Sequence, residues 1–151
     1  MAHTDSYVAL SNRVKTILET NAVTLGLQDV FYGDQMRIPR TPAACVEPGS
    51  KQRELSGLPR RVSNILTCYV LVYLYKLQSA EDIREADDSL AEAIETFLHA
   101  DAQLKTAGEP TVLDSMVTSI ESGYQQKGNS LFRAARITFQ ATSLTLLPST
   151  P

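Results

Sequence analysis

The chain has 151 residues, of which 43% are hydrophobic and 21% are charged, and these proportions exclude a disordered or fibrous protein. This length suits one hydrophobic core, so we expect a single domain over residues 1–151. Fourteen basic residues against seventeen acidic ones give a net charge of -3, which excludes the overall basic charge of a dedicated nucleic-acid-binding protein.

Neither a secreted nor a membrane protein is indicated. The N-terminus lacks the basic and apolar segments of a signal peptide, and no Asn-x-Ser/Thr sequon occurs, so we expect an intracellular product. The longest apolar stretch, Ile65 to Leu77, is shorter than the ~20 residues of a membrane span. Cys45 and Cys68 lie in apolar runs, which favours buried free thiols over a disulfide.

The first third of the chain predicts one helix and two short strands. Apolar residues at spacings of three and four predict a helix over residues 6–20, capped by Thr4 or Asp5. Residues 29–34 read as a short strand ended by a glycine turn. Prolines bracket residues 43–47, which suits an edge strand because proline cannot donate to the ladder of a central strand.

Residues 49–61, which we call the arm, contain glycine, proline and basic side chains but show no apolar period. Such a segment is expected to be exposed, as a long hairpin arm or as a loop. Its basic residues are Lys51, Arg53, Arg60 and Arg61.

Residues 62–75 predict a strand that is apolar on both faces. Alternation puts one group on the first face: Val62, Leu66, Cys68, Val70, Val72 and Leu74. The second face carries Ile65, Tyr69, Leu71, Tyr73 and Tyr75. A strand of this kind must be covered on both sides, by its own chain or by a partner.

The second half predicts a helix and a hairpin. A capping box at Ser79 and Asp82 begins a helix over residues 80–100. Strands over residues 112–124 and 131–146 flank a turn at 125–129, and residues 147–151 form a mobile tail. The expected fold is therefore α+β, with one mostly antiparallel (mixed) sheet, two helices packed on it and a long hairpin arm.

No catalytic, metal-binding or cofactor site is indicated. His3 and His99 are the only histidines, and we expect His99 to interact with the C-terminal end of its helix. No Ser-His-Asp order, phosphate-binding loop, dinucleotide fingerprint or Cys-x-x-Cys motif occurs. The carboxylates of residues 81–95 are expected to form a solvated helix face. The sequence therefore predicts a protein that is not an enzyme.

Two features suit contacts with other molecules. The basic arm is suited to an acidic surface of a neighbouring subunit or to backbone phosphates, with a plain solvated loop as the alternative. The tyrosines Tyr69, Tyr73 and Tyr75 suit an interface because they combine an apolar ring with a polar tip. A helix of the same chain is the alternative cover for them.

The runs Asp29-Val30-Phe31-Tyr32-Gly33-Asp34 and Pro42-Ala43-Ala44-Cys45-Val46-Glu47-Pro48-Gly49, followed by Lys51 and by Arg53-Glu54-Leu55, together with the order of elements, resemble the phage tail terminator family. The resemblance implies a hexameric ring in the virion neck, made in the host cytoplasm, that ends tail-tube polymerisation. It further implies partners in the tail tube protein and the head-tail connector or stopper protein, and genomic DNA passing through the lumen without sequence-specific binding. The family has no catalytic residues to transfer.

We therefore expect the arm and the hairpin tip, residues 125–129, to contact neighbouring subunits or rings. The candidate interface residues are Lys51, Arg53, Arg60, Arg61, Tyr69, Tyr73, Tyr75, Gln126, Lys127 and Asn129. The alternatives are another phage neck, head-tail connector or tail tube protein and, more distantly, a small intracellular enzyme or ligand-binding domain.

Overall fold

A computed structural model describes residues 7–55, 61–77, 89–100 and 112–146. The predicted tail at residues 147–151 lies outside these residues. The elements in chain order are α1 (Tyr7–Thr20), α2 (Ala22–Leu25), β1 (Asp29–Tyr32), β2 (Ala43–Leu55), β3 (Arg61–Lys76), α3 (Ser89–His99), β4 (Val112–Lys127) and β5 (Ser130–Leu146).

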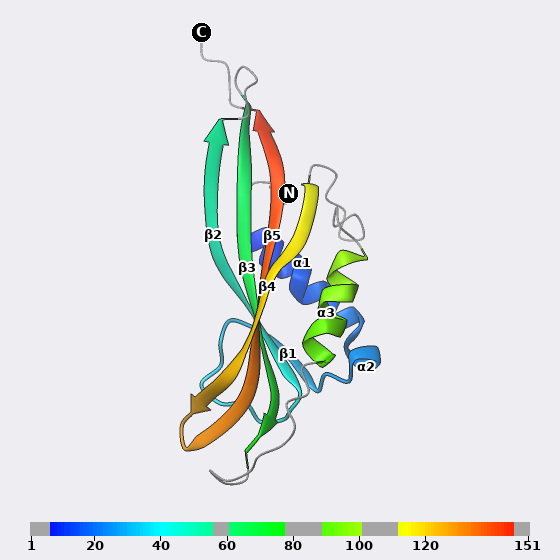
Figure 1. The fold of residues 1–151 in the computed structure, drawn as a ribbon, viewed down its shortest axis with the longest axis vertical. Helices are drawn as coiled ribbons and strands as arrows, with labels where there is room; N and C mark the ends of the chain where they lie inside the picture. Colours follow the sequence, from blue (N-terminus) through cyan, green and yellow to red (C-terminus); the bar gives the residue numbers. More distant parts are fainter. Residues whose placement is uncertain (1–6, 56–60, 78–88, 101–111, 147–151) are drawn as a thin grey trace.

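The strands form one mixed sheet in the order β1-β2-β3-β5-β4. Strand β1 is parallel to β2, and the other neighbours are antiparallel. The long strands twist about one another along the length of the molecule, and the helices lie to one side of them (Figure 1). The predicted α+β class, the mixed sheet and the hairpin arm are confirmed.

The helices bury their apolar stripes against one face of the sheet. Helix α1 contributes Leu10, Val14, Ile17 and Leu18, each at most 8% exposed, at the spacing of one helical face. Helix α3 contributes Ala91, Ile94 and Leu98 to the same core. The predicted first helix is confirmed over residues 7–20, and the predicted second helix is confirmed over 89–99, while its first part lies outside the described residues.

A smaller core lies on the other face of the sheet. Its buried members are Ile38, Ala43, Cys45, Tyr73, Phe132 and Ala134. The loop of residues 33–42, which joins β1 to β2, supplies Ile38 to this core. The loop therefore covers part of this face of the sheet, as the helices cover the opposite face.

The prediction of a short edge strand at residues 43–47 is wrong. Strand β2 has 13 residues, and Ala43 to Val46 lie between β1 and β3. The proline rule nevertheless holds locally, because Pro48 lies beyond the stretch that pairs with β1 and next to a register shift between Pro48 and Ser50. The arm continues β2 to Leu55 as one side of a hairpin with β3, and residues 56–60 lie outside the described residues.

The predicted strand over residues 62–75 is confirmed, but its tyrosines do not share one face. A register shift between Tyr73 and Tyr75 adds one residue to β3 opposite β5. As a result, Tyr73 belongs to the small core, whereas Tyr75 packs against the helix-side core. Tyr73 is also 0% exposed, so the chain itself covers it.

The C-terminal hairpin agrees with the prediction, except that its turn is tighter. The strands continue to Lys127 and from Ser130, which leaves Gly128 and Asn129 in the turn. Gly128 has φ of 60°, a left-handed conformation that glycine adopts without strain. The predicted buried face of the return strand is confirmed for Ala135, Ile137, Phe139 and Ala141.

Gly49, at the irregularity in β2, tests this packing. A Cβ atom there would lie 2.7 Å from the carbonyl oxygen of Thr67 and 2.9 Å from Cε2 of Tyr69. We predict that Gly49→Ala lowers the free energy of unfolding by about 1–3 kcal/mol, because β2 must move away from β3. Gly123→Ala is the matched control, since nothing lies within 4 Å of its added Cβ. Equal urea midpoints for the two variants would contradict this packing.

Candidate interaction surfaces

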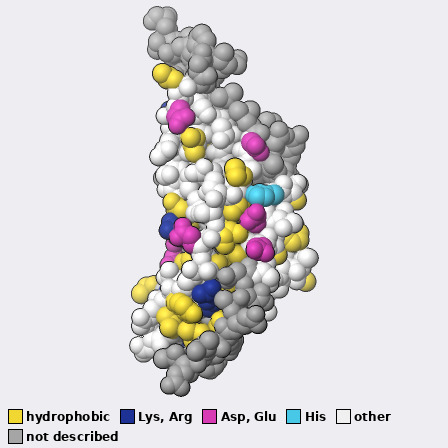
Figure 2. Space-filling view, viewed as in Figure 1, with side chains coloured by type: hydrophobic (Ala, Val, Ile, Leu, Met, Phe, Trp, Pro, Cys, Tyr) yellow, Lys and Arg dark blue, Asp and Glu magenta, His cyan; other side chains and the backbone are white. Residues whose placement is uncertain are grey.

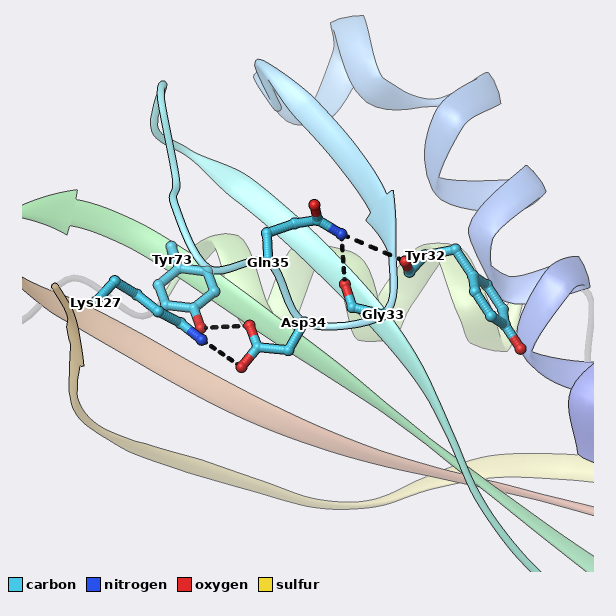
Figure 3. A network of polar contacts seen from close by, with 6 residues as sticks. All are labelled: Tyr32, Gly33, Asp34, Gln35, Tyr73 and Lys127. Atoms are coloured by element: carbon cyan, nitrogen blue, oxygen red, sulfur yellow. Dashed lines mark hydrogen bonds and ion pairs between the residues drawn. The ribbon is translucent and has the colours of Figure 1, made fainter.

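The tip of the β4–β5 hairpin is fixed to the loop of residues 33–42 by an ion pair. Lys127 at the end of β4 donates to the Asp34 carboxylate, and the Tyr73 hydroxyl donates to the other oxygen of the same carboxylate at 2.8 Å (Figure 3). The Lys127 and Asp34 side chains are 15% and 32% exposed. These three residues, which we call the Asp34 cluster, join three segments that are distant in the sequence.

The backbone after β1 places Asp34 over the sheet. Gly33 has φ of 82° and donates its N–H to the carbonyl oxygen of Val46 at 2.7 Å. The Gln35 side-chain amide donates to the carbonyl oxygens of Tyr32 at 3.4 Å and Gly33 at 3.2 Å (Figure 3). The turn therefore reverses the chain so that it runs back across the face of the sheet opposite the helices.

The far end of the loop has its own ion pair. Arg40 donates to both carboxylate oxygens of Asp29, at 2.6 Å and 3.1 Å, and to the carbonyl oxygen of Gln28 at 3.1 Å. Two-point contacts between an arginine and a carboxylate fix direction as well as distance. The loop is thus held at Asp34 and at Arg40, with Ile38 buried between them.

Burial controls the protonation of the groups beneath the loop. It raises the pKa of the Tyr73 phenol above its ordinary range, and the hydrogen bond to Asp34 acts in the same direction. Burial also raises the pKa of Cys45 to about 11, and on the helix side it raises the pKa of Cys68 to about 12. Both cysteines are buried and free, as predicted. Thiols with such pKa values are poor nucleophiles at neutral pH.

A cleft of about 880 Å³ lies between the loop and the hairpin tip. Loop residues 35–39 form one wall and residues 127–130 form the other. Phe31, Lys76 and Phe132 complete the described lining. The predicted tip residues Lys127 and Asn129 line this cleft, whereas the exposed Gln126 donates from its side chain to the carbonyl oxygen of Gly128 at 3.3 Å.

Beyond the loop, the same face of the sheet carries a part-exposed group that we call the open patch. Cross-strand pairing places its members on one face: Glu47, Ile65, Tyr69, Leu71, Met116, Glu121, Arg136, Thr138 and Gln140. The Arg136 guanidinium stacks over the Tyr69 ring at 4.0 Å, and Met116 is 55% exposed. None of the described helices packs against this face. Tyr69 is therefore the one predicted tyrosine that lies on the open patch.

The predicted basic residues of the arm are partly described. Lys51 and Arg53 are exposed on β2, opposite Leu66 and Asn64 of β3. Arg61 begins β3, and Arg60 lies outside the described residues. The β2–β3 hairpin and the β4–β5 tip lie at opposite ends of the molecule (Figure 1). The structure therefore does not bring the predicted interface residues together at one site.

Three further expectations, on His99, on a metal site and on a membrane span, can be compared with the described residues. His99 lies in the last turn of α3 as expected, but its Nε2 accepts the backbone N–H of Val117 on β4 at 2.9 Å. Within the described ranges, no three His, Cys, Asp or Glu residues gather as a metal site. No helix in those ranges is long and apolar enough to cross a membrane.

Sequence reasoning missed Asp34, Arg136 and the loop residues that line the cleft. Asp34 follows a strand and a glycine, which is a common position for a turn residue that directs its side chain across a sheet. Arg136 stands out only as the one charged residue within the alternating segment 135–142. The cleft had no local signal, because its two walls are about 90 residues apart in the chain.

Viewed from one side, hydrophobic side chains are scattered over the upper part of the surface and gather near its lower end, beside a basic residue (Figure 2).

Neither a protein-family model nor a curated protein sequence matches this chain.

The Asp34 cluster can be tested with a double-mutant cycle. We predict a coupling of about 1 kcal/mol between Asp34→Ala and Lys127→Ala in urea unfolding, because the pair is partly buried and shares a hydrogen bond with Tyr73. The exposed pair of Lys15 and Glu19 on α1, with N···O of 2.8 Å, is the control and should give less than about 0.5 kcal/mol. Equal coupling in the two cycles would show that the Asp34 cluster adds nothing beyond a surface ion pair.

The raised pKa values predict a loss of stability at alkaline pH. Above the ordinary thiol pKa of 9.0, the unfolded chain releases protons that the folded chain still holds, so the free energy of unfolding falls as pH rises. Each thiol contributes at most about 1.4 kcal/mol per pH unit between pH 9 and about 11. Cys45→Ala combined with Cys68→Ala should flatten this decline in urea titrations under reducing conditions. An unchanged slope would contradict the assignment.

Proposed function

We propose that this protein is a structural subunit of a phage virion that forms a ring at the head-proximal end of the tail. In this role the ring, a homo-hexamer, ends polymerisation of the tail tube and joins the tail to the head-tail connector or stopper protein. Genomic DNA passes through its lumen without sequence-specific contacts. The proposal rests on the family resemblance of residues 29–55 and on the surfaces described above.

The observation that carries the proposal is the one-sided cover of the sheet. Helices cover one face, the loop of residues 33–42 covers part of the other, and the open patch remains. The patch combines Tyr69, Leu71 and Met116 with a stacked arginine, and aromatic, methionine and arginine residues are enriched at protein interfaces. A subunit that contacts neighbours in a ring needs a surface of this composition on an otherwise stable fold.

The β2–β3 hairpin supplies a second support. It extends to one end of the molecule and exposes Lys51, Arg53 and Leu55, of which Leu55 is 90% exposed. A protruding hairpin at one end and a cleft at the other give the subunit two different ends. Contacts between unlike surfaces generate rings when the rotation between subunits closes.

A different role in the phage neck, as a connector or tail tube protein, is supported by the same surfaces.

One observation favours a ligand-binding domain instead. The cleft of about 880 Å³ falls within the ~300–1,000 Å³ of small-molecule sites. Its rim, however, includes Met36 at 90% exposure, which is unlike an enclosed pocket. A chain that remains a monomer would favour this alternative.

The mass of the purified protein in solution tests the proposal. We expect a species of about six times the 16.6 kDa chain mass, seen as rings by negative-stain microscopy. Lys51→Glu with Arg53→Glu should shift this species toward smaller ones, with an unchanged circular dichroism spectrum. Lys15→Glu, which changes a part-exposed residue on α1, should leave the rings intact. A protein that stays monomeric at all concentrations, with or without a tail tube protein, would contradict the ring.

A further inference from the structure

We propose that the cleft between the loop and the hairpin tip binds an extended segment of another protein, one that carries an acidic side chain flanked by apolar residues. Binding in the cleft does not require the chain to form a ring. The apolar and basic residues that line the cleft favour a polypeptide.

The apolar part of the cleft is suited to side chains of a partner. Phe31, Ile38 and Phe132 line it, and Met36 stands at its rim. Phe132 is held in place by an edge-to-face contact with Tyr73, with ring centroids 5.5 Å apart. A rigid aromatic floor with a flexible methionine at the edge accepts apolar side chains of varied shape.

The charges of the cleft favour an acidic group. Arg37, Lys76 and Lys127 are the charged residues among the described lining, and all three are basic. Asp34 neutralises Lys127 by the ion pair. Arg37 and Lys76 remain exposed, and neither has an ion pair with any residue in the described part of the chain. The cleft therefore retains two positive charges beside an apolar floor.

This combination distinguishes a polypeptide from a nucleic acid. Nucleic-acid grooves follow a phosphate chain with many cations and lose affinity steeply with salt. Here two cations adjoin aliphatic and aromatic surface, which matches one carboxylate with apolar neighbours. The exposed Asn129 amide in the turn adds a donor and an acceptor that suit the backbone of an extended segment.

The Asp34 cluster fixes the width of the cleft. Lys127 and Gln35 line opposite walls, and Asp34, next to Gln35, joins its wall to the other through Lys127. A cleft whose walls are already held apart at a fixed distance binds without the entropic cost of ordering them. The ion pair between Asp34 and Lys127 therefore also holds the two walls of the cleft in position before a partner binds.

Selection from a displayed library of random nonapeptides tests the inference. We expect enrichment of peptides with one Asp or Glu flanked by apolar residues on the immobilised wild-type chain. Synthetic copies of the enriched peptides should bind the variant Arg37→Glu with Lys76→Glu about tenfold more weakly, as two attractive contacts become repulsive. Arg13→Glu with Lys15→Glu reverses the same number of charges on α1, away from the cleft, and should change binding by less than twofold.

Failure of enrichment, enriched peptides without an acidic residue, or equal binding to the Arg37 and Lys76 variant would overturn the inference. A single-stranded oligonucleotide that outcompetes the peptides would also overturn it. The solution mass of each variant is measured alongside and separates the two proposals. Peptide binding by a monomer would support the binding cleft and contradict the ring. Rings that bind no peptide would support the ring and contradict the binding cleft.

Discussion

Strand β3 is apolar on both faces, and the arrangement of the rest of the molecule follows from how each face is removed from water. Burial of apolar surface is the main favourable term in folding, at roughly 25 cal/mol per Å². Helices α1 and α3 cover the face of Val70 and Val72. The opposite face has no described helix, and the loop of residues 33–42 covers only its lower part, around Tyr73.

The Asp34 cluster determines where this cover ends. Its ion pair draws the loop toward the hairpin tip, so that Cys45, Tyr73 and Phe132 are buried while the region around Tyr69 and Arg136 stays open. Two different surfaces therefore lie on the same face: a cleft between the loop and the hairpin tip, and the open patch, where Tyr69, Leu71 and Met116 lie beside Arg136. Both fit a protein that works by contacting other chains.

Much of the fold could be predicted from periodicity, and the exceptions depend on one irregularity in β3 and on contacts between segments distant in the sequence. The stripes of α1 and the alternation of β5 depend only on near neighbours in the sequence. The face of Tyr75 could not be predicted, because one extra residue in β3 reverses every later side chain and no residue type marks it. The central position of Ala43 to Val46 depends on the parallel strand β1, and parallel pairing has no short-range signal. The cleft likewise depends on a contact between Asp34 and Lys127.

The central claim is that the open patch is an interface between protein chains. Oxidative footprinting tests it directly, because Met116 lies on the patch at 55% exposure and Met36 lies at the cleft rim at 90% exposure. The two methionines should be oxidised readily in dilute protein. On assembly, we expect protection of Met116 and unchanged oxidation of Met36 in the absence of an added partner. Equal oxidation of Met116 in the dilute and assembled protein would contradict the account.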